Sequence, residues 1–502
     1  MINKFCVFPL IFSALCGFAS AELRLPAVIG SNMVLQRDKP IPIWGWAAAG
    51  DEVAVTLGSD GKKIKAGEDG RWTVQLDALP AGGPHELKVK SGGKEIVLSN
   101  VLMGEVWLCS GQSNMEWSVR ASNNPQEEIG NAKYPKIRLF HIPKRPATSP
   151  QDDVSATWRE CNPDTVVNFS AVGYYFGRHL HAELDVPIGL IGSAWGGTRI
   201  EPWTPLEGFS EVEALRGLGK QTEQQMPKAF VPLAEKWAAD VKAAAESGRR
   251  LPAPPKQPAP FNHGSPTGLY NGMVAPIVPF SLRGAIWYQG ESNNGEGMLY
   301  HEKMKALIAG WRKVFGNPQL AFHFVQLAPF RYGNGERTLP YIWEAQTATL
   351  AVPGTGMAVI TDIGNVGDIH PRNKQGVGKR LALWAMAKNY GKSDLVYSGP
   401  LFKEMRVEEK SIRVIFAHAE SGLISRDGKP LSDFSIAGDD GKFVPAQARI
   451  DGATVLVSSK DVANPKNVRF GWHHMVNPNL SNKEGLPAGP FKTDDWKGAT
   501  GE

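Results

Sequence analysis

The sequence predicts an α/β domain with a parallel sheet, flanked on both sides by smaller β regions. Near-continuous apolar runs such as VWLCSG, IGLIGSAWGG and GMAVITDIG alternate with helical patterns between residues 101 and 395. Runs of this kind are typical of parallel strands that are covered on both faces. Short alternating segments separated by Gly, Asp-Gly or Pro fill residues 22–100 and return in residues 396–502, which predicts two β-sandwich-like regions. At 502 residues the chain is also too long for one hydrophobic core.

The first 21 residues predict a secretory signal. They contain an early Lys4, an apolar stretch too short to span a bilayer comfortably, and the small-x-small pattern of residues 19–21. No other apolar run approaches membrane-spanning length. We therefore expect a secreted or periplasmic protein without a membrane span.

Cysteine usage leaves one question open. Cys16 could carry a lipid, but Ser13 stands where lipoproteins place an aliphatic residue, which disfavours acylation. Removal of the signal leaves Cys109 and Cys161. They could pair in an oxidising compartment, or Cys109, in the apolar run VWLC, could be a buried free thiol.

Composition excludes one class of partner. The formal net charge of +5 is spread over the whole chain, and no long Lys/Arg run occurs. Nucleic acid is therefore not an expected partner. Within the α/β region, residues 206–260 are helix-rich and charged and end in the proline-rich LPAPPKQPAP, which predicts an insertion.

Four polar loops each follow a predicted strand of the α/β region. Their sequences are GQSN (111–114), GSAWGGTRIEPW (192–203), WYQGESN (287–293) and TDIGNVGDIHPRNK (361–374). The carboxyl ends of the strands in such a sheet open onto one crevice. We therefore expect the four loops to meet there.

The loops offer the groups that acyl transfer requires. Ser113 follows the first strand, where it could be a nucleophile or simply the N-cap of the next helix. His370 can take the serine proton at neutral pH. A carboxylate that orients the imidazole would be Asp368, two residues earlier, with Asp362 as the competitor.

Developing negative charge on the substrate oxygen needs hydrogen-bond donors. The backbone N–H groups of Ser113 and Gly196 are candidates, and the paired glycines at 196 and 197 allow close approach of a ligand. A side-chain amide from Gln289 or Asn293 would complete the oxyanion hole.

Other residues of these loops are candidates for the substrate surface. Aromatic faces pack on the apolar faces of sugar rings, whereas the same side chains could simply roof the sheet. Arginines can bind an acidic sugar's carboxylate. The candidate substrate-binding residues are Trp117, Trp195, Arg199, Glu291 and Arg372, with Trp203 as a further aromatic. Glu291 can alternatively be a buried acid that ties the loops together.

The motifs GQSN, WGGT, YQGESN and DIHP, in that order, resemble the SGNH-hydrolase superfamily, and specifically its sialate O-acetylesterase branch of carbohydrate esterases. The resemblance implies a flavodoxin-like sheet, Ser-His-Asp machinery and an acetylated carbohydrate substrate, with no metal or other cofactor. Ser113 matches the nucleophile and His370 the base. Gly196 matches the family's second sequence block and the QGESN loop its third.

We therefore expect a serine esterase that removes acetyl groups from sugar hydroxyls, and sialate O-acetylesterase activity is the leading expectation. An acetylxylan or other plant-polysaccharide acetylesterase is the alternative on the same machinery. A non-catalytic carbohydrate-binding protein is the alternative from another class.

Overall fold

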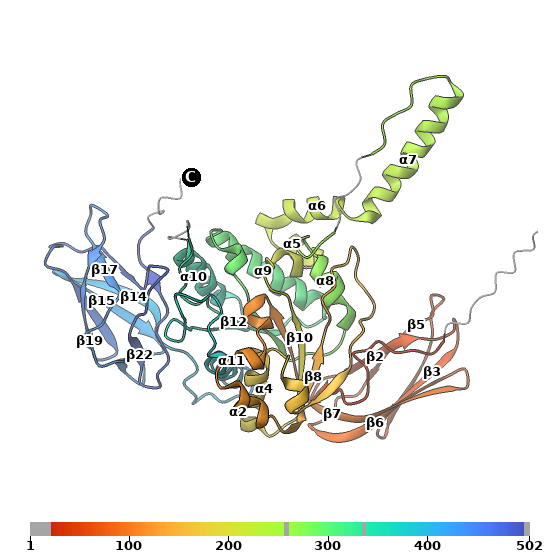
Figure 1. Ribbon diagram of the computed structural model, residues 1–502, viewed down its shortest axis with the longest axis horizontal. Helices are drawn as coiled ribbons and strands as arrows, with labels where there is room; N and C mark the ends of the chain where they lie inside the picture. The colour runs from red at the N-terminus through yellow and green to blue at the C-terminus, as the bar shows by residue number, and fades with distance from the viewer. Residues whose placement is uncertain (1–21, 256–260, 334–337, 496–502) are drawn as a thin grey trace, which may run out of the picture.

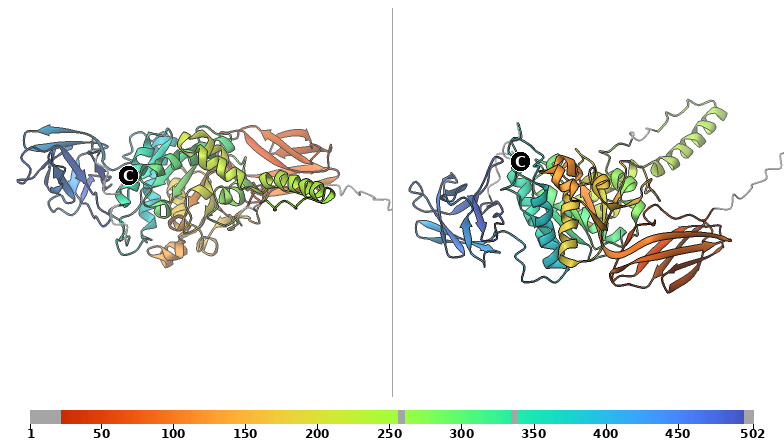
Figure 2. Two further views of the ribbon diagram at one scale, coloured as in Figure 1. Left: turned by 90° about the horizontal axis from the view of Figure 1, so that it is seen from above. Right: turned by 60° about the horizontal axis from the view of Figure 1, so that its bottom comes forward.

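The computed structural model describes residues 22–255, 261–333 and 338–495. The expected signal sequence lies outside the described residues. A central α/β body carries one β region at each end, so that the molecule is elongated (Figures 1 and 2). The predicted fold class is therefore confirmed.

Within the described residues, the central sheet has six parallel strands and one antiparallel edge strand. In spatial order they are β13 (Thr355–Ala358), β12 (Ala321–Val325), β11 (Gly284–Tyr288), β7 (Lys94–Gly111), β10 (Ile188–Ala194), β8 (Tyr134–His141) and the antiparallel β9 (Trp158–Cys161). After β7 the chain adds β8 and β10 on one side, and later β11 to β13 on the other. The carboxyl end of β7 is therefore the switch point at which ligands bind in open α/β sheets.

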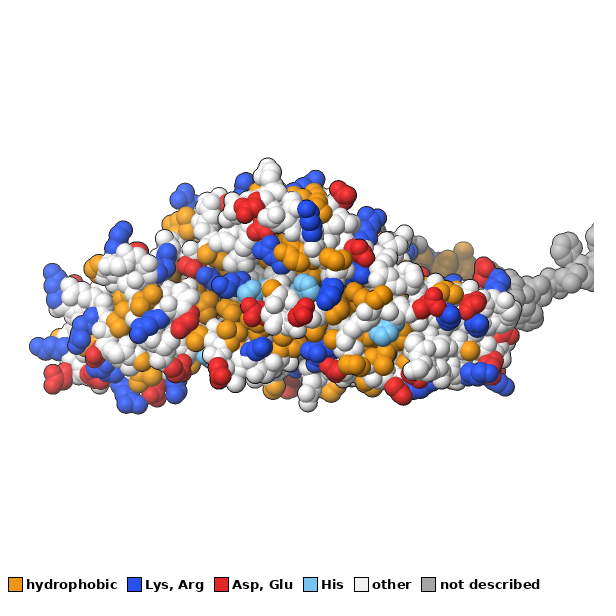
Figure 3. All heavy atoms as spheres, turned by 90° about the horizontal axis from the view of Figure 1, so that it is seen from below, with side chains coloured by type: hydrophobic (Ala, Val, Ile, Leu, Met, Phe, Trp, Pro, Cys, Tyr) orange, Lys and Arg blue, Asp and Glu red, His pale blue; other side chains and the backbone are white. Residues whose placement is uncertain are grey.

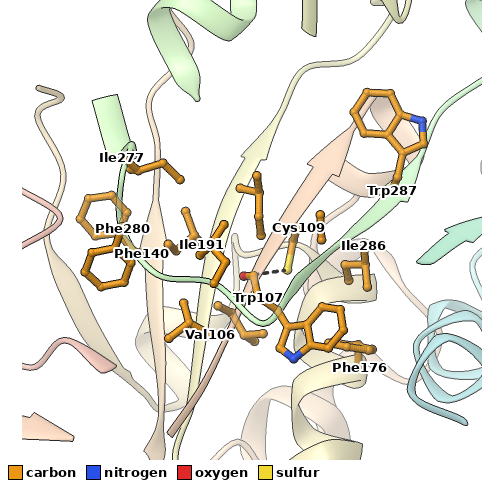
Figure 4. Packing of buried hydrophobic residues seen from close by; sticks show 14 of the residues in the cluster. Val106, Trp107, Cys109, Phe140, Phe176, Ile191, Ile277, Phe280, Ile286 and Trp287 are labelled. Atoms are coloured by element: carbon orange, nitrogen blue, oxygen red, sulfur yellow. Dashed lines mark hydrogen bonds between the residues drawn. The ribbon is translucent and has the colours of Figure 1, made fainter. Parts of the chain in front are cut away.

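Helices cover both faces of this sheet. On one face, α4 (Ala171–Leu184) and α11 (Lys374–Asn389) pack side by side, and Phe176 of α4 meets Trp107 of β7 with ring centroids 5.0 Å apart. On the other face, α9 (Met298–Val314) places Trp311 against Trp287. Figure 4 shows the apolar packing around Trp107.

The two remaining cysteines are free. Cys109 and Cys161 are both buried thiols, so the alternative of a disulfide is wrong. Burial raises the pKa of the Cys161 thiol to about 12 and also raises that of Cys109.

The remaining helices lie in the connections of the central body. They are α1 (Ser113–Glu116), α2 (Pro125–Gly130), α3 (Pro163–Val166), α5 (Leu206–Glu211), α6 (Arg216–Gln224), α7 (Pro227–Glu246), α8 (Gly268–Met273) and α10 (Leu339–Ala348). The segment expected as an insertion contains α5, α6 and α7, and α7 projects from the body (Figure 1). Within the described residues, none of the helices has the length and apolar character that crossing a membrane requires.

Strand β7 joins the amino-terminal β region to the central sheet. It runs without a break across residue 100, pairing first with β6 and then with β10 and β11. The other strands of this region are β1 (Val34–Gln36), β2 (Ile41–Trp46), β3 (Glu52–Leu57), β4 (Asp60–Lys65), β5 (Arg71–Leu76) and β6 (Gly82–Ser91).

The carboxyl-terminal β region has its own small core. Its strands are β14 (Leu401–Glu408), β15 (Ser411–Ala417), β16 (Leu423–Ser425), β17 (Phe434–Ala437), β18 (Val444–Pro445), β19 (Gln447–Asp451), β20 (Thr454–Ser458), β21 (Asn467–Phe470), β22 (Leu480–Asn482) and β23 (Phe491–Lys492).

One face of the molecule, seen in Figure 3, carries hydrophobic patches among histidine and charged side chains along its middle.

Candidate active site

A glycine turns the chain at the end of β7. Gly111 has a φ of +143°, and a Cβ there would lie 2.2 Å from the carbonyl oxygen of Tyr288 on β11. Only glycine allows this backbone conformation and this approach. Gln112 follows, and α1 begins at Ser113, which places the serine at the switch point of the sheet.

Ser113 and His370 meet across the crevice. The Oγ of Ser113 lies 2.9 Å from Nε2 of His370. Trp117 stacks on the imidazole with ring centroids 4.7 Å apart and planes inclined by 17°. Burial lowers the pKa of His370, the charge of Lys374 lowers it further, and Asp368 opposes both. The ring is thereby kept neutral and able to accept a proton near neutral pH.

The two candidate acids have different partners. Asp368 accepts a hydrogen bond from the backbone N–H of His370 at 2.9 Å, and its Oδ1 lies 3.9 Å from Nδ1 of the ring. Asp362 instead pairs with Arg380 through two hydrogen bonds of 2.6 and 2.7 Å. Asp368 is thus the carboxylate beside the imidazole.

The Gly196 loop reaches the serine, but its amide already has a partner. The backbone N–H of Gly196 donates to Oε2 of Glu116 at 2.7 Å, and Oε1 of Glu116 accepts from Lys144 at 2.5 Å. A Cβ on Gly196 would lie 3.2 Å from the Cβ of Ser113, so the two loops are in contact.

The expected side-chain donors of the oxyanion hole are engaged elsewhere. The amide nitrogen of Gln289 donates to Asn293 Oδ1 at 2.7 Å and to the carbonyl of Thr198 at 3.2 Å. That of Asn293 donates to Glu201 and to Glu296, at 3.1 and 3.0 Å. Each amide group has two N–H donors, so neither has one left for a substrate oxygen. Both are buried polar groups that support the loops in this structure.

The candidate substrate residues divide into three kinds. Trp117 covers the imidazole, and Trp195 stacks on His263 with centroids 5.3 Å apart. Arg199 is held by ion pairs with Glu201 and Glu296, and Arg372 is exposed.

The remaining two candidates are Glu291 and Trp203. Glu291 is half-buried, but its carboxylate is enclosed: Oε1 accepts from Asn114 at 2.6 Å, and burial raises its pKa. Trp203 is buried in the core.

Three polar residues at this site were not expected from the sequence. Asn114 and Lys374 are buried beside Ser113 and His370, and Glu116 holds the Gly196 loop. Asn114 belongs to the GQSN motif, which was the available signal, whereas nothing local marks Lys374 as buried. In the described parts of the chain, no three His, Cys, Asp or Glu side chains are grouped to hold a metal.

A serine hydroxyl within hydrogen-bond distance of an imidazole, at the switch point of a parallel sheet, is an arrangement found in serine hydrolases. Comparison with known proteins gives the family. The family model described as "Carbohydrate esterase, sialic acid-specific acetylesterase" matches residues 103–226 and 257–384. The chain belongs to this family.

Similar proteins extend the likeness over nearly the whole chain. Sialate O-acetylesterase of Rattus norvegicus is 32% identical, covering 90% of each chain. That of Homo sapiens is 31% identical, over 94% of this chain and 93% of its own. The crystal structure of a carbohydrate acetylesterase from Xanthomonas citri has 37% identity and a TM-score of 0.81, over 95% of this chain and all of that one. The protein is a carbohydrate O-acetylesterase, a carboxylic ester hydrolase.

Proposed function

We propose that the chain removes acetyl groups from the hydroxyls of sialic acids, with Ser113 as nucleophile, His370 as base and Asp368 as the orienting acid. The substrate is proposed from the family and from the relatives in Rattus norvegicus and Homo sapiens. The observation that carries the mechanism is the 2.9 Å contact between Ser113 Oγ and His370 Nε2.

The proposed reaction is a two-step acyl transfer. Ser113 Oγ attacks the acetyl carbonyl carbon while its proton passes to Nε2 of His370, which then gives it to the departing sugar oxygen. Water then attacks the acetyl-serine while the same imidazole takes its proton, and that proton passes to Ser113 Oγ as acetate leaves. Asp368 favours the charged imidazolium in both steps.

Backbone amides are the proposed oxyanion donors. The N–H of Ser113 lies in the first turn of α1, where no intrahelical acceptor exists. The N–H of Gly196 is the second donor, and it becomes available when the Glu116 carboxylate turns away from it. Each such donor contributes about 3 kcal/mol to the barrier reduction.

Replacement of the serine tests the mechanism. We expect Ser113→Ala to remain folded and to lose activity on O-acetylated sialic acid by about 10³-fold or more, because no other group forms the acetyl intermediate. Ser210→Ala, an exposed serine on α5, is the control. Acetate release by a folded Ser113→Ala at the rate of the unchanged protein would remove Ser113 from the mechanism.

A substrate panel tests the proposed sugar. It contains O-acetylated sialic acids, acetylated xylan oligomers and a chromogenic acetyl ester. A kcat/KM that is higher on acetylated xylan oligomers than on O-acetylated sialic acids would make plant polysaccharides the substrate instead. Binding of these sugars without acetate release from any of them would identify a non-catalytic carbohydrate-binding protein.

We also propose that the protein is exported to the periplasm or the medium. The support is the charged, apolar and small-residue pattern of residues 1–21. Expression of the full chain followed by fractionation should give a shortened protein outside the cytoplasm. Full-length protein retained in the cytoplasm would contradict export.

A further inference from the structure

A chain of buried polar groups connects three loops of the site. Lys374 Nζ donates to Asn114 Oδ1 at 2.5 Å. Nδ2 of Asn114 donates to Glu291 Oε1 at 2.6 Å and to the carbonyl of Ile369 at 2.9 Å. Asn114 follows Ser113, and Ile369 precedes His370. The amide thus ties the nucleophile to the loop of its base.

The position of Lys374 is unfavourable for a cation in two respects. Its side chain is fully buried, and removing an ammonium from water costs several kcal/mol. It is also the first residue of α11, where the helix dipole repels positive charge. Burial lowers its pKa to about 7. A neutral residue of the same length would fill this space at lower cost, so the charge itself requires an explanation.

The groups around Lys374 supply that explanation. Glu291 and Asp368 favour the charged form of Lys374. Glu291 lies in the short helix Glu291–Asn293, and Asp368 lies in the loop of residues 361–374, called the histidine loop below. The rings of Tyr288 and Trp117 lie 5.1 and 5.9 Å from Nζ. Besides Lys374, the titratable groups that face Glu291 are Tyr288, Tyr300 and Tyr332.

His370 feels two opposed charges. Lys374 disfavours the protonated imidazole, and Asp368 favours it. Of the neighbours of the ring, Ser113 and Trp117 carry no charge.

Resting on the proposed function, we propose that Lys374 is a positioning residue for the esterase reaction. Through Asn114 it fixes the Ser113 loop against the His370 loop, and its charge keeps the imidazole in the neutral form that accepts the serine proton. Glu291 sustains that charge from the opposite side of Asn114. Asp368 then stabilises the imidazolium only once the proton has moved.

The test is the pH profile of kcat/KM for Lys374→Met, with Lys379→Met, an exposed lysine on the same helix, as control. We expect kcat to fall by about tenfold to a hundredfold, because the loops that carry Ser113 and His370 are no longer held at the correct distance from one another. The acidic limb should move to higher pH, because a charge that opposed protonation of His370 is gone. KM should change little, and Lys379→Met should behave as the unchanged protein.

A second variant keeps the proposal testable if Lys374→Met does not fold. Glu291→Gln retains an acceptor for Asn114 but no longer favours the charge of Lys374. The acidic limb of its kcat/KM profile should therefore also move to higher pH, by less than in Lys374→Met. A limb that stays in place in the folded variants, or loss of folding in both, would make the cluster purely structural and overturn the proposal. Absence of acetate release by the unchanged protein would instead overturn the proposed function.

Discussion

Charge and partners distinguish the two aspartates of the histidine loop. Asp362 and Arg380 are each only 12% exposed and satisfy one another through a bidentate pair. Asp368 is 37% exposed and faces the imidazole. A carboxylate that already neutralises an arginine contributes to stability, whereas one that faces a titrating ring affects its protonation.

Exchange of each aspartate for asparagine should separate these roles. Asp368→Asn should lower kcat by about 10²-fold or more, because the charge that stabilises imidazolium is lost. Its acidic limb should move to lower pH, since Asp368 raises the pKa of His370. Asp362→Asn should keep its turnover and lose about 2 kcal/mol of unfolding free energy. Steady-state kinetics and urea unfolding of both variants check this, and the reverse pattern would transfer the catalytic role to Asp362.

The sequence predicted which loops meet, but not which atoms are free in them. Ser113 and His370 could be placed because polar loops after parallel strands share one edge of the sheet. Gln289 and Asn293 lie in such a loop too, yet their amides bond to Thr198, Glu201 and Glu296. Hydrogen-bond partners far apart in the sequence decide this, and no local pattern encodes them.

At the scale of elements, β7 changes character along its length. Its first half alternates between exposed and half-buried residues, as in a sheet with one wet face, and its second half is buried throughout. This change of pattern predicts a boundary between residues 100 and 101, whereas β7 runs from Lys94 to Gly111 across that position. The strand ends where Gly111 passes close to the backbone of β11 and releases the chain into α1.

Gly111→Ala should therefore disturb both the sheet and the site. A Cβ 2.2 Å from the carbonyl oxygen of Tyr288 must push the strands apart, which we expect to cost about 3 kcal/mol. Gly248→Ala is the control, because Gly248 also has a positive φ but no atom within 4 Å of the added Cβ, and about 1 kcal/mol is expected there. Equal melting temperatures for the two variants would show that the close contact between Gly111 and the backbone of Tyr288 does not determine stability.

At the scale of the whole molecule, one carboxylate connects the amino-terminal region to the central body. Glu105 of β7 has a fully buried side chain and accepts hydrogen bonds from Arg37 at 2.5 Å and from Arg283 at 2.7 and 3.0 Å. Gln36 and Tyr390 donate to it as well, at 3.0 and 3.1 Å. Gln36 and Arg37 belong to the amino-terminal region, whereas Arg283 and Tyr390 belong to the central body. At the other end, Val476 and Leu486 of the carboxyl-terminal region join the central core.

Glu105→Gln should loosen this junction. Burial alone would raise the pKa of Glu105, but the bonds from Arg283, Arg37 and Gln36 hold it below its usual value of 4.5. A lowered pKa means that the carboxylate stabilises the fold above pH 4.5 and loses this effect as pH falls through its folded-state pKa. We expect Glu105→Gln to lose about 3 kcal/mol of unfolding free energy at pH 7, because two guanidinium groups lose their shared charge.

Urea unfolding of Glu105→Gln at several pH values measures both effects. The difference from the unchanged protein should narrow once the pH drops below 4.5, where the unfolded chain's carboxyl also takes up a proton. Glu52→Gln, which removes an exposed pair with Lys63, should change stability by less than about 1 kcal/mol at any pH. A difference between Glu105→Gln and the unchanged protein that stays constant down to low pH would assign the loss to shape rather than charge. It would also show that Glu105 does not join the two regions through its carboxylate.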